Sequence, residues 1–308
     1  MKAALLLVLV AALTTATLPE WNDSPHIHSA GITTQTAGDF SGRDLDRFSK
    51  RRAMAHLRQL AGEIGVRTRT SANETAAARY AAAEFRSLGY DVHLQKFSVD
   101  SGTSRNVVAR WPGAKRYPFV VGGHMDTVPA SPGANDNASG VAATLELARL
   151  VAGKEQARWI TFVVFGSEEY GNDGTHHVGS RTFVNRLGTD GRDRLAGMIS
   201  VDMISDGGVI VGNSGIAGDV VARTLFNRLR AKGFPAVFRT SCDCSDNGPF
   251  EHGGIPASYI WSGDDPDYHS STDTVPNLDP ADLARSGRAV RVFIKAFDKA
   301  YLDRMRQG

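Results

Sequence analysis

Two apolar runs, WITFVVF at residues 159–165 and GMISV at residues 197–201, restrict most strongly what this chain can fold into. Continuous β-branched and apolar runs are typical of strands that are covered on both faces. Further strands are expected at 91–97, 105–111, 117–121 and 257–261, and helical periodicity is found at 44–65, 73–89, 138–151, 217–233 and 279–305. This alternation predicts one α/β domain, with a mostly parallel, twisted sheet sandwiched between helices.

Acidic and histidine side chains follow the predicted strands at their carboxyl ends. In open α/β sheets this edge is where ligands bind, so side chains from separate segments are expected to converge in one crevice. The residues concerned are His124, Asp126, Asp136, Glu168, Glu169, Asp202 and His269.

This crevice would bring five carboxylates together. Like charges about 4 Å apart repel by several kcal/mol at intermediate dielectric, so without cations some carboxylates would be protonated or the site would open. Two divalent ions would neutralise most of the charge. Imidazole and carboxylate ligands together favour zinc, with manganese or cobalt as alternatives. The sequence therefore predicts a metal site at the carboxyl edge of the sheet.

Five motifs carry a resemblance to a known family. In chain order they are GGHMDT, GANDNASG, FGSEEYG, SVDM and YHSSTDTVPNLD. They resemble those of the co-catalytic zinc aminopeptidases, family 28 of the metallopeptidases, and especially its short secreted bacterial members. The resemblance runs from about residue 70 to the C-terminus. It implies two zinc ions per chain and hydrolysis of the N-terminal residue from peptides.

The resemblance also implies a role for each motif residue. One zinc would be held by His124 and Asp202, the other by Glu169 and His269, with Asp136 bridging both. Glu168 would act as the general base, and Tyr268 would donate a hydrogen bond to the developing oxyanion. Met203 would line the pocket that receives the side chain of the first substrate residue. A cis peptide between Asp136 and Asn137 is implied as well.

The chemistry of hydrolysis is consistent with these roles. Two ions about 3.5 to 4 Å apart can acidify one water and polarise the scissile carbonyl, which requires a bridging carboxylate such as Asp136. Glu168 could take the proton of that water and pass it to the leaving amine. Asp126, two residues from His124, is expected to accept the second ring N–H of that histidine and fix its tautomer.

Several other polar residues receive structural interpretations. His176 and His177 are read as the opening of the next helix, and His252, Asp264 and Asp265 as loop residues. Cys242 and Cys244 are equally compatible with a disulfide and with free thiols. Members of the family often have histidine at the position of Asn247, near the expected specificity pocket. The class of N-terminal residue that the site accepts therefore stays open.

The N-terminal segment has the layout of a secretory signal, with Lys2 before a short apolar run. We expect a signal peptide at 1–20, a linker or pro-segment at 21–42 and a zinc peptidase domain at 43–308. The mature protein would be secreted or periplasmic, with no membrane attachment after the signal is removed. It is expected to be a monomer that acts on peptide or protein N-termini.

Other classes of function find less support. The formal net charge is +2 and no Lys/Arg block is interleaved with aromatics, which argues against nucleic-acid binding. Neither G-x-S-x-G nor H-E-x-x-H occurs, and GNSGIAG has the wrong spacing for a dinucleotide loop. The alternatives are a glutaminyl-cyclase-like or carboxypeptidase-like enzyme of the same fold, and a non-catalytic binding domain.

Overall fold

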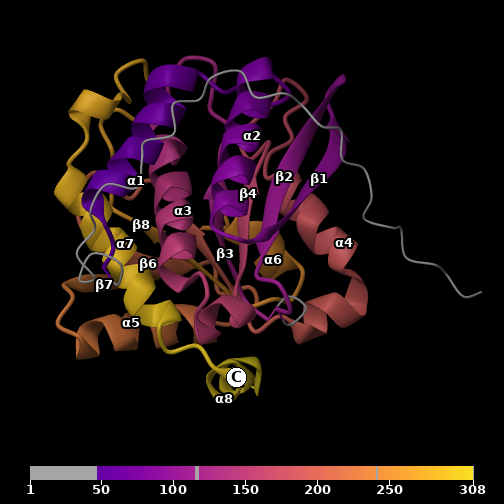
Figure 1. The fold of residues 1–308 in the computed structure, drawn as a ribbon, viewed down its shortest axis with the longest axis vertical. Helices are drawn as coiled ribbons and strands as arrows, with labels where there is room; N and C mark the ends of the chain where they lie inside the picture. Colours follow the sequence, from indigo (N-terminus) through magenta and orange to yellow (C-terminus); the bar gives the residue numbers. More distant parts are fainter. Residues whose placement is uncertain (1–46, 115–117, 241, 308) are drawn as a thin grey trace, which may run out of the picture. The chain divides into compact units, whose positions relative to one another are not determined.

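The computed structural model describes residues 47–114, 118–240 and 242–307. The expected signal peptide and linker, and the first residues of the predicted catalytic domain, lie outside the described residues. Within those ranges eight strands form one sheet in the order β1-β2-β4-β3-β5-β8-β6-β7 (Figure 1). The strands are β1 (Asp91–Val99), β2 (Gly102–Arg110), β3 (Val120–His124), β4 (Thr161–Phe165), β5 (Met198–Val201), β6 (Val209–Asn213), β7 (Ala236–Thr240) and β8 (Ala257–Trp261).

The sheet is parallel at its centre and mixed toward its edges. Strands β4, β3, β5 and β8 run parallel to one another. The hairpin of β1 and β2 adds antiparallel strands on one side, and β6 joins β8 antiparallel on the other. The predicted α/β sheet is confirmed, and its parallel centre brings the carboxyl ends of β3, β4 and β5 to one edge.

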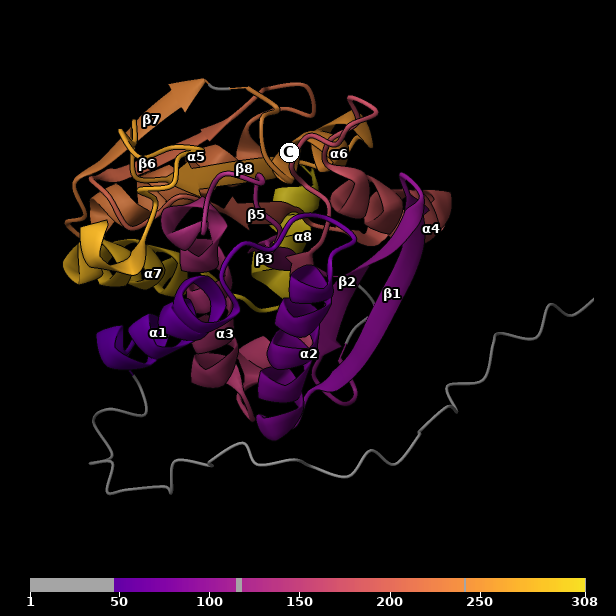
Figure 2. The same ribbon diagram turned by 90° about the horizontal axis from the view of Figure 1, so that it is seen from above.

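Helices cover both faces of this sheet (Figures 1 and 2). One face packs against α1, α2, α3, α5, α7 and α8, and the other against α4 and α6. Their bounds are α1 (Lys50–Leu57), α2 (Ala72–Ser87), α3 (Gly140–Val151), α4 (Val178–Arg194), α5 (Val220–Ala231), α6 (Asn247–His252), α7 (Pro280–Ile294) and α8 (Lys299–Gln307).

Successive residues of the central strands enter different cores. Phe162 and Val164 of β4 belong to the larger hydrophobic cluster, whereas Val163 and Phe165 belong to the smaller one beneath α4 and α6. Because helices cover both faces of the sheet, side chains that point to either face are apolar. The uninterrupted run at 159–165 therefore has its explanation in the two helical layers.

The predicted closing helix at 279–305 is wrong in one respect, because the structure divides it into α7 and α8. The backbone N–H groups of Ala296 and Phe297 bond three residues back, which ends α7 in a tight turn. Asp298 then accepts a hydrogen bond from the backbone N–H of Tyr301 at 2.8 Å, as the cap of a new helix. A helical hydrophobic period continues across such a turn, so the period alone did not reveal the break.

The predicted first helix also differs from the structure. The helix α1 begins at Lys50, where the side chain of Ser49 accepts a hydrogen bond from the backbone N–H of Arg52 at 3.4 Å. It continues into a π-helical segment, Arg58–Ile64.

In the described part of the chain no helix combines the length and the hydropathy needed to cross a bilayer.

Candidate metal centre

Five of the predicted metal-ligating residues lie at the carboxyl edge of the central strands. The last residue of β3 is His124, while Glu169 follows β4 and Asp202 follows β5. Asp136 reaches the same place from the segment before α3, and His269 from the loop after β8. Together they line a cavity of about 380 Å³. The convergence expected from the strand ends is therefore present.

Asp136 lies between the two histidines of the site. Its Oδ1 atom is 3.2 Å from Nε2 of His124, and its Oδ2 atom is 3.2 Å from Nε2 of His269. The carboxylate is nearly fully buried, whereas His269 is about one-third exposed. One carboxylate thus presents a separate oxygen to each of two imidazoles.

Each histidine has a further carboxylate beside it. Nε2 of His124 is 3.5 Å from Oδ2 of Asp202, and Nε2 of His269 is 3.2 Å from Oε2 of Glu169. Beside Asp136 the side chains therefore form two pairs, His124 with Asp202 and His269 with Glu169. Glu168 contributes a third neighbour to His124, with its Oε2 atom 3.8 Å from Nε2.

The titration of these groups reflects a site crowded with buried negative charge. Burial and the neighbouring Asp136 carboxylate raise the pKa of Glu169 to about 7. Burial, followed by the charge of Glu169, also raises the pKa of Glu168 well above its usual range. Burial alone would lower the pKa of His269, but hydrogen bonds to Asp136 and Glu169 raise it to about 10. In the absence of other cations the two imidazoles supply the compensating charge.

Two carboxylate oxygens test whether this site fits metal ions. Oδ1 of Asp202 and Oε1 of Glu169 are buried, and neither has a hydrogen-bond partner. A buried polar atom without a partner is costly, and a bound cation would satisfy both. Three ligating atoms of His124, Asp136 and Glu169 also lie within 4.8 Å of one another. Imidazole and carboxylate donors at this spacing fit zinc.

Asp126 supports the site in a different way from the one predicted. Its side chain accepts the backbone N–H groups of Glu168 at 2.9 Å and Glu169 at 3.0 Å. The Nδ1 atom of His124 lies 3.1 Å from the backbone carbonyl oxygen of Asp126 and 3.7 Å from its carboxylate. The backbone oxygen is thus the acceptor closest to Nδ1, and the carboxylate instead fixes the loop that carries both glutamates.

A residue that sequence reasoning missed, Asp273, holds the loop of the bridging carboxylate. Its two carboxylate oxygens accept the backbone N–H groups of Asn135 at 2.6 Å and Asp136 at 3.1 Å. The peptide between Asp136 and Asn137 is cis, as the resemblance implied. Asp273 lies in the YHSSTDTVPNLD motif, but nothing local in the sequence connects it with a loop 137 positions away.

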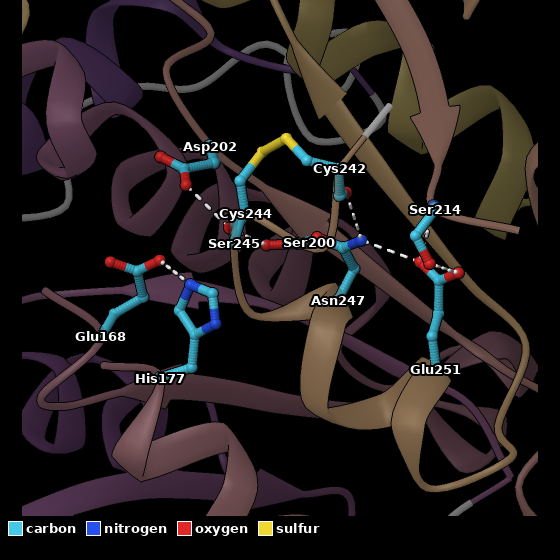
Figure 3. Close-up of a disulfide and its surroundings, with 10 residues drawn as sticks. All are labelled: Glu168, His177, Ser200, Asp202, Ser214, Cys242, Cys244, Ser245, Asn247 and Glu251. Atoms are coloured by element: carbon cyan, nitrogen blue, oxygen red, sulfur yellow. Dashed lines mark hydrogen bonds and ion pairs between the residues drawn. A yellow bond between two sulfur atoms is a disulfide. The ribbon is translucent and has the colours of Figure 1, made fainter. Parts of the chain in front are cut away.

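The cysteines form a disulfide, Cys242–Cys244, in the wall of the cavity (Figure 3). The next residue, Ser245, donates a hydrogen bond to Oδ2 of Asp202 at 2.8 Å and lies 2.9 Å from the hydroxyl of Ser200. The segment that carries the disulfide therefore also holds one of the candidate ligands in place.

Tyr268 and Met203 line the same cavity. The ring of Tyr268 stacks on His269 with ring centres 3.7 Å apart, and its side chain is half exposed. Asp264 and Asp265, which were interpreted as simple loop residues, also line the cavity. Asn247 bonds to Glu251 at 2.8 Å, away from the ligands (Figure 3).

His176 and His177 directly precede α4, in agreement with the sequence interpretation. The second of them has a further contact that the interpretation missed. Its Nε2 atom lies 2.8 Å from Oε1 of Glu168 (Figure 3). Nine positions separate these residues in a loop, and no periodic pattern marks a contact across it. His252 instead pairs with Asp243 at 2.7 Å.

Comparisons with known proteins agree with the fold. The Leupeptin-inactivating enzyme 1 of Streptomyces exfoliatus is 30% identical over 266 residues, which is 77% of this chain and 59% of that protein. The chain thus spans less than two thirds of the length of this relative.

Two solved structures share the fold. A zinc aminopeptidase from Bacillus subtilis superposes with a TM-score of 0.75 at 19% identity, over 83% of this chain and 97% of the other. A glutaminyl cyclase from Bacteroides thetaiotaomicron superposes with a TM-score of 0.71 at 21% identity, over 82% of this chain and all of the other.

The family model of peptidase family M28 matches residues 106–294. This range begins within β2, ends with α7 and contains all five candidate ligands together with Glu168. The chain belongs to peptidase family M28.

Proposed function

We propose that this protein is a zinc-dependent aminopeptidase with two metal ions per chain. One observation carries the proposal: the two oxygens of Asp136 face two different histidines at the same distance, 3.2 Å. A single metal would need only one of these groups. The shared carboxylate, with Asp202 on one side and Glu169 on the other, suits a pair of ions.

The chain's own groups account for the rest of the reaction. Zinc ions at these positions would polarise the scissile carbonyl and acidify the attacking water. As the water oxygen bonds to the carbonyl carbon, Glu168 takes its proton. Glu168 then gives this proton to the amine nitrogen as the carbon–nitrogen bond breaks. Tyr268, beside His269, would donate its hydroxyl hydrogen to the carbonyl oxygen as negative charge develops there.

The charge of the cavity favours recognition of a free N-terminus. Among the described residues that line it there is no lysine or arginine, and carboxylates surround the candidate metal centre. An α-ammonium group is attracted to such a site, whereas a terminal carboxylate would be repelled. This supports an aminopeptidase over a carboxypeptidase. Met203 is placed to contact the side chain of the first substrate residue.

We also propose that the protein acts outside the cytoplasm, as a monomer. The apolar N-terminal segment supports export. The disulfide in the cavity wall supports an oxidising compartment.

A glutaminyl cyclase is the second candidate, because a protein with that activity shares the fold. The symmetric placement of His124 and His269 about Asp136 favours the two-metal reaction.

Two sets of substrates test the proposal. Purified zinc-loaded protein should hydrolyse aminoacyl anilides with a free amine and not the same compounds acetylated at nitrogen. Equal hydrolysis of the acetylated compounds, or cyclisation of N-terminal glutamine without hydrolysis, would overturn the aminopeptidase assignment.

One substitution tests the general base. Glu168→Gln should lower kcat by roughly 10²- to 10⁴-fold, the usual contribution of a general base, while metal content and fold are kept. Glu63→Gln, at an exposed position of the π-helical segment, is the matched control and should leave kcat unchanged. A near-normal kcat for Glu168→Gln would show that another group takes the proton.

A further inference from the structure

The buried histidine before α4 is the strongest feature that the proposed reaction does not use. The side chains of His177 and Glu168 are 6% and 9% exposed, and their Nε2 and Oε1 atoms are 2.8 Å apart. Figure 3 shows the imidazole directed at the carboxyl group. A buried contact of this length lies within hydrogen-bonding distance.

The two oxygens of Glu168 have different surroundings. Oε1 faces His177, whereas Oε2 lies 3.8 Å from Nε2 of His124 and faces the candidate metal centre. An ionised carboxylate can only accept hydrogen bonds, so the imidazole must be the donor when Glu168 is charged. The contact then occupies one oxygen and leaves the other free to take a proton.

The backbone keeps this pair in register. The N–H of His177 donates to the carbonyl oxygen of Glu168 at 2.6 Å, and the N–H of Val178 donates to that of Ser167 at 2.8 Å. The backbone of His177 is left-handed, with φ at 52°. Main-chain and side-chain contacts thus join the same two residues, so the ring has little freedom to leave the carboxyl group.

The surroundings of His177 keep it neutral. Burial, followed by the nearby His176 and His124, lowers the pKa of His177 to about 3. A neutral imidazole carries a single ring proton. Whenever Glu168 is ionised, that proton must lie on Nε2, because the carboxylate can only accept.

We infer that His177 is a positioning residue, which donates a hydrogen bond from Nε2 to Oε1 of Glu168 and so aims Oε2 at the reacting water. The inference rests on the proposed role of Glu168 as general base. The catalytic step itself is unchanged, because Oε2 of Glu168, and not the ring of His177, takes and gives the transferred proton.

Removal of the donor tests the inference through kinetics. His177→Leu should lower kcat by about 10- to 100-fold, as expected for loss of a hydrogen bond to a charged group, with KM changed less than about twofold and zinc content unchanged. His177→Gln places an amide N–H at similar reach and should recover most of kcat. His177→Asn suits the left-handed backbone but is too short to reach, and should resemble the leucine variant.

A matched control separates positioning from stability. His56→Leu, on α1, removes another imidazole hydrogen bond, the 2.6 Å contact between Nδ1 and the hydroxyl of Tyr80. This variant should lose stability with kcat unchanged. If leucine and asparagine at position 177 both keep wild-type kcat, or if glutamine is no better than they are, the inference is wrong.

A double-mutant cycle distinguishes failure of this inference from failure of the proposed function. If His177 acts through Glu168, His177→Asn should have no further effect on kcat in a Glu168→Gln background. A multiplied loss in the double variant would contradict the inference. A normal kcat in Glu168→Gln alone would instead overturn the general-base assignment.

Nitrogen-15 NMR of histidine-labelled protein provides a readout that does not depend on activity. The resonances of His177 should report a neutral ring protonated at Nε2, and Glu168→Ala should shift its Nε2 signal. A ring protonated at Nδ1, or a signal insensitive to Glu168→Ala, would contradict the contact.

Discussion

At the scale of single residues, the site depends on carboxylates whose two oxygens each contact a different group. Asp136 shares its oxygens between His124 and His269. Those of Asp126 go to two consecutive backbone N–H groups. Asparagine at position 136 or 126 would replace one acceptor oxygen by an NH₂ donor. It could therefore reproduce only half of the contacts.

The carboxylate of Asp273 should be equally intolerant of replacement by an amide. In Asp273→Asn, one N–H group of the amide would face the backbone N–H of Asn135 or of Asp136, so the variant should be about 1–3 kcal/mol less stable. Urea unfolding measures this loss. The matched control is Asp193→Asn, at an exposed position of α4, which should change stability by less than about 0.5 kcal/mol. Equal stabilities of the two variants would show that Asp273 does not hold the loop.

Residue types at strand ends were enough to predict which side chains meet at the candidate metal centre, but not the groups that support them. His124, Glu169 and Asp202 each follow an apolar run, so their common edge could be deduced. The partners His177 and Asp273 lie in irregular loops, where a contact depends on the path of the chain in space. No periodic signal encodes such a path, which is why both were missed.

At the scale of elements, the first turn of α3 lies against the end of β5. A Cβ atom added at Gly140 would collide with the carbonyl oxygen of Val201 and with the side chain of Asn137. Asn137 itself donates to that carbonyl at 3.0 Å and accepts the N–H of Gly140 at 2.8 Å. The start of α3 and the strand that precedes Asp202 are therefore locked together.

This contact predicts a steep cost for the smallest substitution. Gly140→Ala should destabilise the fold by several kcal/mol, because neither backbone can yield without moving Asp136 or Asp202. Gly62→Ala, in the π-helical segment where a Cβ would meet no atom within 4 Å, should be neutral or slightly stabilising. Thermal unfolding compares the two variants, and a Gly140→Ala protein as stable as Gly62→Ala would contradict the packing.

The helix α1 should contribute a pH dependence of stability through His56. Burial, with the nearby Arg52 and Arg149, lowers the pKa of His56 to about 4 in the folded protein, below its ordinary 6.5. The unfolded chain therefore binds a proton first, and stability falls as the pH decreases from about 6.5 to about 4, by up to about 3 kcal/mol. Urea unfolding at each pH compares the wild type with His56→Leu. The difference in their free energies of unfolding should shrink as the pH decreases through this range. A constant difference between them would show that His56 keeps an ordinary pKa.

At the scale of the whole molecule, the sequence predicted the centre of the sheet and the hairpin of β1 and β2, but not the two strands on the other side. The strands β3, β4, β5 and β8 were recognised from their apolar runs, and they carry or precede most of the ligands. In contrast, β6 and β7 were not predicted. The strand β7 is exposed at three of its five positions, so little hydrophobic signal marks it. Each strand that carries or precedes a candidate ligand was marked by an apolar run, which explains why this part of the sheet could be recognised.

In the proposed centre two separate metal positions share Asp136, and the number of zinc ions bound per chain measures this. Protein stripped of metal, then titrated with zinc and measured by calorimetry and elemental analysis, should bind two ions per chain. Asp136→Asn should lose most of this binding, since it removes an oxygen that belongs to one of the two positions. Two bound zinc ions in the wild type, with recovery of anilide hydrolysis as they bind, are the predicted result. Saturation at one ion, or full activity without zinc, would contradict the account.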